Sequence, residues 1–318
     1  MHTEEEFDWA GGFDPNARSV RHVRALYRLH GIFRAHGVSP IYAVSYPVVA
    51  DDEAAEVLRG FLNEDSKSGP GAVVAAHLHP WVCPPIEEEI SSQNSYPGNL
   101  PPELERRKIE TLTAAIHRRF GKKPTVYLSG RYGSGPNTVA ILARAGYRVD
   151  LSPSPTYDYR GDGGPDFREV RCTPFRTPTF PEVLRVPHTS AYVGWACRNE
   201  RPVLDMLLNR RVRESILWPL LVRSGAVRRI RLSPEGFDLK HQLALTRSLI
   251  AEGLGVFVLS LHSPSVVPGN TVYTRTEAEV DELHRRVDVF LGMFMNEFAG
   301  EAILPHQLLE DFPVRESA

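Results

Sequence analysis

Hydrophobic residues recur along this chain in two alternating patterns, one helical and one extended. Apolar positions three and four apart predict helices over residues 19–36, 51–63, 101–121, 136–145, 203–222, 239–252 and 280–298. Short apolar runs predict buried strands at residues 41–44, 72–79, 125–128, 147–151, 184–188, 230–232 and 256–259. Residues 156–182, rich in glycine, proline and charge, are predicted to be irregular. The alternation favours a mostly parallel α/β architecture.

A polar residue stands at the end of nearly every predicted strand. These residues are Ser45, His77, Ser129, Ser152, His188, Ser233 and His262. The carboxyl ends of parallel strands meet at one edge, which hosts the active site in βα barrels and in open doubly wound sheets alike. No strand is followed by a glycine-rich nucleotide-binding motif, so nothing supports the doubly wound option.

Composition narrows the class of protein. The chain has 318 residues with a net charge of −2, which argues against a nucleic-acid partner. Its apolar runs are too short to span a membrane, and its acidic start does not resemble a secretory signal. Cys83, Cys172 and Cys197 are too far apart for a disulfide framework or a CxxC metal site. We therefore expect a cytoplasmic protein without a membrane span.

His77 and His79 are the first candidates for chemistry. Side chains alternate between the faces of a strand, so both imidazoles point the same way if the strand reaches them. Pro80 ends regular pairing just beyond them. Two imidazoles on one face at a strand end can bind a metal ion such as zinc. Two ordinary loop histidines would fit the same residues.

Three more candidate residues stand at or just after the ends of predicted strands. His262 can act as a general acid or base, or it can be a hydrogen-bonded histidine in a turn. Arg131, between glycines, can orient a carboxylate or polarise a carbonyl, or it can be a surface residue. Asp150 can pair with Arg131 or with a histidine, or it can cap its strand.

Four segments, taken together, resemble the motifs of the polysaccharide deacetylase (NodB-homology) superfamily, and within it the WalW-like branch. They are residues 3–9 (TEEEFDW), 76–81 (AHLHPW), 129–133 (SGRYG) and 260–269 (SLHSPSVVPG). The resemblance covers nearly the whole chain.

Two positions depart from the family pattern. The family carries an aspartate, at the end of an apolar strand, before the run that begins at Thr3. His2 stands in that place here, and we expect the strand to be missing. The third motif has Leu128 and Ser129 where the family usually has an arginine.

The resemblance implies one domain over residues 1–318, folded as a distorted, incomplete (β/α) barrel of the polysaccharide deacetylase type. It implies a hydrolase of C–N bonds other than peptide bonds, which removes an acetyl group from an N-acetyl or O-acetyl sugar of a surface polysaccharide or its precursor. The carbohydrate is then the substrate. Two alternatives remain, a catalytically decayed carbohydrate-binding or scaffold protein and an amidohydrolase of small non-sugar amides.

The resemblance also implies roles for the candidate residues. His77, His79 and Glu4 would hold a divalent metal, and their nitrogen and oxygen atoms suit zinc. His262 would give a proton to the departing amine, and Arg131 would orient a carboxylate. Asp150 completes the candidate catalytic set.

Overall fold

The computed structural model describes most of the 318 residues. The described residues are 1–8, 11–63, 71–195, 212 and 218–312. Cys197 and most of the helix predicted over residues 203–222 lie outside them. The described end of that helix is α8 (Trp218–Arg223).

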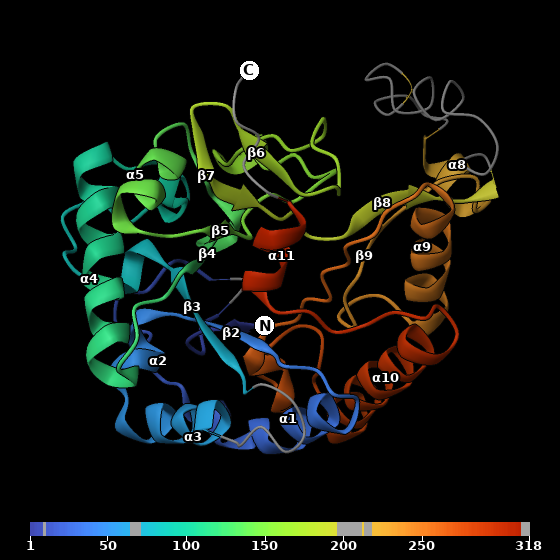
Figure 1. Cartoon of the computed structure of the whole chain (residues 1–318), viewed down its shortest axis with the longest axis horizontal. Coiled ribbons are helices and arrows are strands. Elements are labelled where there is room, and N and C mark those ends of the chain that lie inside the picture. The colour runs from blue at the N-terminus through green and yellow to red at the C-terminus, as the bar shows by residue number, and fades with distance from the viewer. Residues whose placement is uncertain (9–10, 64–70, 196–211, 213–217, 313–318) are drawn as a thin grey trace.

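A seven-stranded, mostly parallel sheet forms the centre of the molecule (Figure 1). In spatial order it contains β1 (His2–Thr3), β2 (Ile41–Val44), β3 (Val73–Leu78), β4 (Val126–Ser129), β5 (Val149–Asp150), β7 (Phe180–Arg185) and β6 (Phe175–Thr177). Only β6 is antiparallel to its neighbour. A second, two-stranded antiparallel sheet pairs β8 (Ser190–Val193) with β9 (Arg228–Arg231). The predicted α/β class is confirmed.

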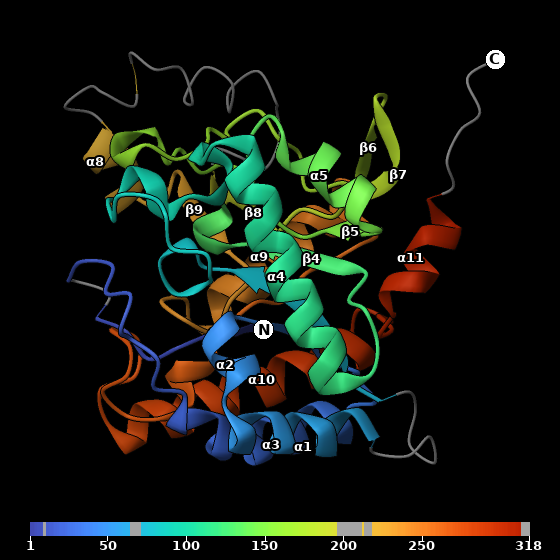
Figure 2. The same cartoon turned by 90° about the vertical axis from the view of Figure 1, so that its left-hand side faces the viewer.

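Amphipathic helices surround the strands (Figures 1 and 2). The α-helices besides α8 are α1 (Leu26–Ala35), α2 (Tyr46–Ala50), α3 (Asp52–Asn63), α4 (Pro102–Phe120), α5 (Thr138–Ala145), α9 (Leu239–Ala251), α10 (Glu277–Asn296) and α11 (Pro305–Asp311). The 3₁₀ turns are η1 (Arg21–Ala25), η2 (Pro80–Val82), η3 (Gln93–Ser95), η4 (Pro97–Asn99), η5 (Gly130–Tyr132), η6 (Arg160–Asp162) and η8 (Ser263–Val266). No described helix combines the length and apolarity needed to cross a membrane.

On its other side the ring of strands continues through the short β8–β9 ladder and through isolated backbone hydrogen bonds. The isolated bonds run from His2 N to Leu261 O (2.9 Å) and from Ser260 N to Leu232 O (3.1 Å). The bonds from Leu232 N to Thr189 O (2.8 Å) and from Val186 N to Asp150 O (2.9 Å) extend the β8–β9 and β5–β7 ladders. Among the described residues, the segment 256–261 is thus joined to its neighbours without a ladder. This is the distorted, incomplete barrel that the sequence predicts.

Four local predictions are wrong. Residues 256–259 are assigned to no strand, because only isolated bonds join this apolar segment to its neighbours. The region predicted to be irregular contains β6 and the first half of β7, where charged side chains hide the strand pattern. The expectation of no strand before Glu4 also fails, since β1 pairs with β2. Helix α11 was not predicted.

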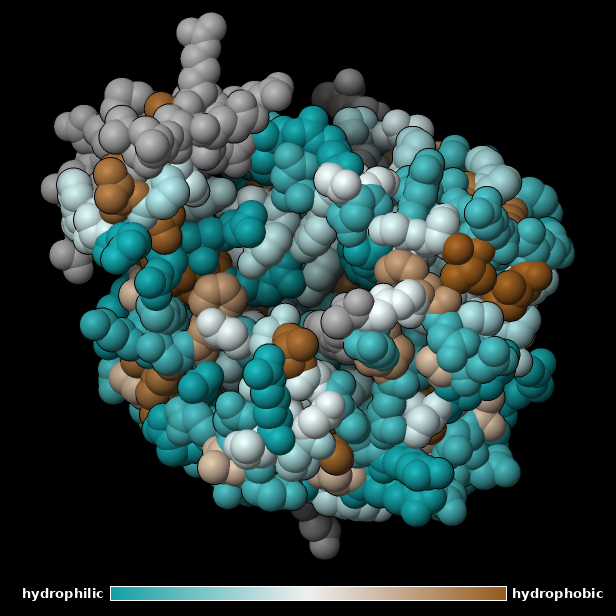
Figure 3. Space-filling model, turned by 180° about the vertical axis from the view of Figure 1, so that it is seen from behind, coloured by the Kyte–Doolittle hydropathy of each residue, from teal (hydrophilic) through white to brown (hydrophobic). Residues whose placement is uncertain are grey.

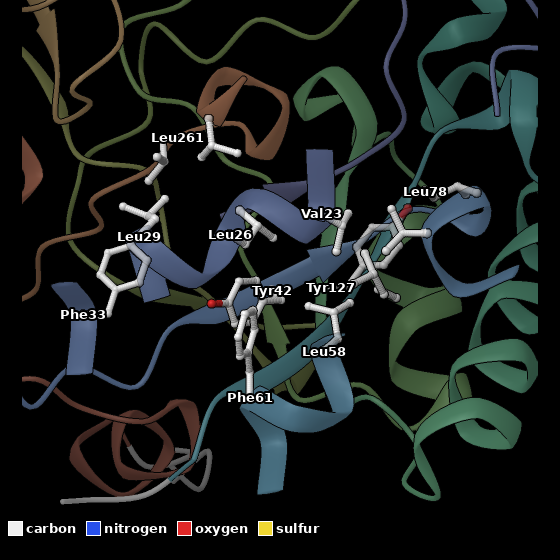
Figure 4. Close-up of a cluster of buried hydrophobic side chains, with 14 of the residues drawn as sticks. Val23, Leu26, Leu29, Phe33, Tyr42, Leu58, Phe61, Leu78, Tyr127 and Leu261 are labelled. Atoms are coloured by element: carbon white, nitrogen blue, oxygen red, sulfur yellow. The ribbon is translucent and has the colours of Figure 1, made fainter. Parts of the chain in front are cut away.

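The main core lies between the sheet and the helices on its outer side. Side chains from η1, α1, β2 and α3 pack together with Leu261, as Figure 4 shows. Burying each large apolar side chain stabilises the fold by about 1.5–3 kcal/mol. Polar groups in this core are bonded: the Tyr42 hydroxyl lies 2.7 Å from Nδ1 of His30. By contrast, the outer face seen in Figure 3 is largely hydrophilic.

The buried carboxyl of Glu105 makes the stability of the fold depend on pH. Burial raises the pKa of Glu105 to about 7, although Thr138 donates a hydrogen bond to it. The folded protein therefore holds this proton more tightly than the unfolded chain does. Stability should fall as the pH rises from about 4.5 to 7, by up to about 3 kcal/mol from this group.

We predict that Glu105→Gln removes this loss, because a neutral amide has no charge to bury. In urea unfolding at pH 5 and pH 8, the free energy of unfolding of the variant relative to that of the wild type should be higher at pH 8. Glu103→Gln, at an exposed position on the same helix, is the control. An equal difference between variant and wild type at both pH values would contradict the prediction.

Candidate active site

The carboxyl ends of the strands surround a cavity of about 330 Å³. Its lining includes Glu4, His77, His79, Arg131, Arg231 and His262. The structure therefore brings together every candidate residue of the sequence analysis except Asp150.

Strand register places Glu4 beside His77. Thr3 pairs with Val44, and Val44 pairs with Ala76, so the next residue along β1 and along β3 reaches the same level. The His77 ring is held by Nδ1, which donates to the carbonyl of Leu128 at 2.9 Å. A carbonyl only accepts, so this bond fixes the tautomer and leaves the lone pair of a neutral ring on Nε2. That atom lies 3.2 Å from Oε2 of Glu4.

A carboxylate holds His79 in the same way. Nδ1 of His79 donates to Oε1 of Glu5 at 2.7 Å, and its Nε2 lies 3.5 Å from Oε2 of Glu4. Burial alone would raise the pKa of Glu5, but the His79 ring outweighs burial and lowers it. Glu5 is therefore ionised and accepts the hydrogen bond. A carboxylate behind a histidine that faces a metal is a recurrent feature of metal sites.

Helix α4 fixes the turn that follows His79. The buried ammonium of Lys108 donates to the carbonyls of Pro80 at 3.0 Å and Cys83 at 2.8 Å, and forms an ion pair with Glu88 at 2.9 Å. The turn also stacks the Trp81 ring on His79, with centroids 4.3 Å apart. The turn after β3, held in place by Lys108, thus orients the His79 ring through Trp81.

Glu4, His77 and His79 converge as three acceptors without a donor between them. Burial lowers the pKa of His77 to about 4, so its ring is neutral near pH 7. Burial also raises the pKa of Glu4, which shows how costly its carboxylate is without a positive partner. The three ligand atoms lie within 4.8 Å of one another. A set of lone pairs aimed at one point fits a cation, and one carboxylate with two imidazoles suits zinc.

His262 has a carboxylate of its own. Nδ1 of His262 donates to Oε2 of Glu235 at 2.8 Å, and its backbone N–H donates to Oε1 at 3.0 Å. Burial lowers the pKa of His262, but the carboxylates of Glu235 and Glu4 outweigh burial, so the pKa is raised. The ring is thus poised to carry a proton beside the three acceptors.

Two further histidines extend the cluster. The His2 ring lies 4.4 Å from His262 and 5.1 Å from His77, centroid to centroid. Burial lowers the pKa of both His2 and His188, so both rings are neutral. Neither ring nitrogen of His188 has a hydrogen-bond partner among the residues that the structure describes.

Arg131 forms part of the cavity wall. Its guanidinium pairs with Asp162 and donates to Ser95 Oγ at 2.6 Å. It also lies over the rings of Phe13 and Tyr96, at 5.0 and 4.1 Å. These contacts give Arg131 a full set of structural partners, and Asp162 is its carboxylate instead of Asp150.

Asp150 lies at the end of β5, away from the cavity. It pairs with Arg185 at 3.0 Å and accepts a hydrogen bond from the backbone of Ser152 at 2.9 Å. The expected pairing with Arg131 or a histidine is therefore not found. The contacts of Asp150 are those of a strand-end residue.

Sequence reasoning gave no role to three residues of the site, Glu5, Glu235 and Arg231, whereas His188 was named as a polar residue at a predicted strand end. Glu235 had a usable signal, because it follows a predicted strand in a Ser-Pro-Glu turn, much as His262 precedes Ser-Pro-Ser. Glu5 lies in the first of the four motif-like segments but had no role assigned to it, and Arg231 carried no signal. Their roles depend on partners far along the chain, which only the folded structure brings near.

The amino-acid sequence matches no known family model and no curated protein. Several solved structures resemble the fold. A presumptive polysaccharide deacetylase from Mycobacterium smegmatis has a TM-score of 0.49 and 15% identity, over 92% of this chain and 80% of that one. Puue allantoinase has a TM-score of 0.45 and 16% identity, over 83% of this chain and 65% of that one.

A third structure is the 4-alpha-glucanotransferase from Thermococcus litoralis. It has a TM-score of 0.49 and 15% identity, over 97% of this chain but only 38% of that one. Likenesses of this strength do not choose among three different activities. The function therefore has to come from the residues of the site.

We predict that Glu235→Gln lowers the pKa of His262, because the carboxylate that favours the charged ring is gone. NMR titration of the His262 ring in metal-free protein measures this. Ser265→Ala, which removes a hydroxyl bonded to Glu235 without changing any charge, should have the smaller effect. An unchanged His262 titration in Glu235→Gln would show that the pair does not set its protonation.

Proposed function

We propose that this protein is a metal-dependent hydrolase that removes an acetyl group from an N-acetyl or O-acetyl sugar. The observation that carries the proposal is the convergence of Glu4, His77 and His79 beside the His262–Glu235 pair. Four sequence motifs add support from the polysaccharide deacetylase superfamily. The WalW-like branch, and a surface polysaccharide or its precursor as substrate, belong to the proposal and rest on those motifs alone.

Glu4, His77 and His79 would hold the metal, which we propose to be zinc. A second group, Glu4 with His2 and His262, also has its ligand atoms within 4.8 Å. That group fits a cation less well, because Glu235 favours the protonated form of His262 and a protonated ring has no lone pair to give. The first group has both tautomers fixed with Nε2 available.

A divalent ion bound there would polarise the acyl carbonyl and lower the pKa of water. The residues of the chain supply the proton transfers. His2 is a neutral imidazole in the same cavity and can accept a proton. His262, protonated and held by Glu235 through Nδ1, can give the proton on Nε2 to the departing amine. Arg131, bonded to Asp162, shapes the wall instead of meeting the reacting atoms.

Cavity size favours a second candidate function, hydrolysis of a small non-sugar amide. About 330 Å³ lies near the lower limit for ligand pockets. A space of this size accommodates a monosaccharide unit or another small acylated molecule. Comparing kcat/KM for N-acetylated monosaccharides, oligosaccharides and small amides separates the two functions.

We predict one divalent ion per chain, lost in His77→Ala and in His79→Ala because each removes a ligand. Elemental analysis of metal-supplemented protein measures this, with His36→Ala on the surface as control. Glu5→Gln should keep the ligands but weaken binding by about 10- to 100-fold, since it removes the support of His79. A wild-type protein without bound metal would contradict the proposal and favour the decayed carbohydrate-binding or scaffold protein.

We predict that His262→Ala lowers kcat by roughly 10²–10⁴-fold, the usual contribution of general acid catalysis. Metal content should not change. An acetyl ester should lose less activity than the matching amide, because an alkoxide leaves more readily than an unprotonated amine. Equal losses for ester and amide would remove His262 from the proton-donor role. His241→Ala, outside the cavity, is the control.

A further inference from the structure

Arg231 lines the same cavity as Arg131 and is the second arginine there. It ends β9, and its guanidinium lies between the rings of Tyr132 and Tyr157, at 4.4 and 4.1 Å from their centroids. Aromatic rings therefore pack against the guanidinium, whose N–H groups also donate hydrogen bonds.

Only neutral groups accept those hydrogen bonds. Arg231 donates to the hydroxyls of Tyr132 at 2.5 Å, Ser154 at 2.6 Å and Tyr159 at 3.0 Å. Among the residues that the structure describes, no carboxylate forms an ion pair with it, and its buried Nε has no acceptor. Arg231 is partly buried, and a charge withdrawn from water with neutral partners alone is costly, so proteins normally supply a counter-charge.

Two other arginines near the strand ends show that pattern. Arg131 pairs with Asp162, and Arg185 pairs with Asp150. Glu235, a carboxylate on the same side of the cavity, gives both oxygens to His262 and Ser265. The counter-charge of Arg231 is therefore missing from the described part of the chain, although the residue lines the cavity.

We propose that Arg231 binds a carboxylate of the substrate, so that the enzyme acts on anionic acylated molecules. Planar guanidinium groups match carboxylates well, and such charge-assisted bonds are among the stronger ones in proteins. The inference rests on the proposed hydrolase function and narrows its substrate class. It distinguishes a hexuronic acid, or another acylated acid, from a neutral sugar.

The carboxylate site adjoins the metal-ligand group without coinciding with it. The Tyr132 hydroxyl lies 2.5 Å from Nη1 of Arg231 and 3.5 Å from Nε2 of His2. His2 in turn contacts His77, edge to face. A substrate that places its carboxylate on Arg231 would thus direct its acetyl group toward Glu4 and His77.

Binding of two matched ligands tests the inference. N-acetylglucosaminuronate carries a carboxylate where N-acetylglucosamine carries a hydroxymethyl group. Calorimetry on the wild-type chain should show the acid binding about 10- to 100-fold more tightly. Arg231→Met should abolish this preference, and Arg231→Lys should retain part of it, because the charge stays but the planar fork is lost.

Arg229→Gln is the matched control. Arg229 lies on the same strand and stacks on Tyr157 at 4.0 Å, but it is exposed. The Arg229→Gln variant removes one positive charge, as Arg231→Met does, and should leave the preference for the acid intact. If both variants reduce the preference equally, general charge is responsible and the inference fails.

Repeating the titrations after chelation distinguishes Arg231 from a bound metal as the carboxylate's partner. A preference that survives chelation and disappears in Arg231→Met supports the inference. A preference lost on chelation, or equal affinity for the two ligands in the wild type, overturns it. Turnover is measured separately: a preference in binding without hydrolysis of either ligand would leave the anion site standing and refute the proposed function.

Discussion

The parallel register of the first three strands is the constraint on which the site depends. Ala43 of β2 lies level with His2 on one side and with Ala75 on the other. Two residues further on, Glu4 and His77 reach the same level at the carboxyl edge. A shift of one residue would turn either side chain to the opposite face. The small residues Ala75 and Ala76 and the apolar core beneath them therefore position the charged groups above.

The half of the site that follows apolar strands could be predicted from the sequence. His77, His79 and His262 stand where strand-like runs end, and the fold brings them to one cavity. The pairings could not be predicted: Glu235 follows a predicted strand, but its bond to His262, like the contacts of Arg231, forms only on folding. Asp150 shows the opposite error: a carboxylate at a strand end looked functional, and its counter-charge is a structural arginine. Residues 256–259 have the composition of a strand, yet hydropathy alone does not say whether neighbouring backbones offer a ladder.

Two cations near the site, Lys108 fully buried and Arg231 partly buried, differ in the partners of their charge. Lys108 has a carboxylate and two carbonyls as partners, so residues of the chain itself balance its charge and accept its hydrogen bonds. Removing one member of such a set leaves the rest uncompensated, at a cost of about 3–5 kcal/mol. Arg231 has hydroxyls and aromatic rings instead. A cation without a counter-charge in the protein favours the binding of a ligand that carries a negative charge.

The uneven ring of strands divides the site into a stiff part and a compliant part. His77 lies in a laddered strand, and Glu4 and His79 directly follow laddered strands, whereas His262 follows a segment joined by isolated bonds. Amide protons in β2, β3 and β4 should accordingly exchange with solvent deuterium far more slowly than those of residues 256–261. In the proposed hydrolase, the ladders would keep the ligand atoms at fixed spacing, whereas the isolated bonds would let the proton donor follow the leaving group.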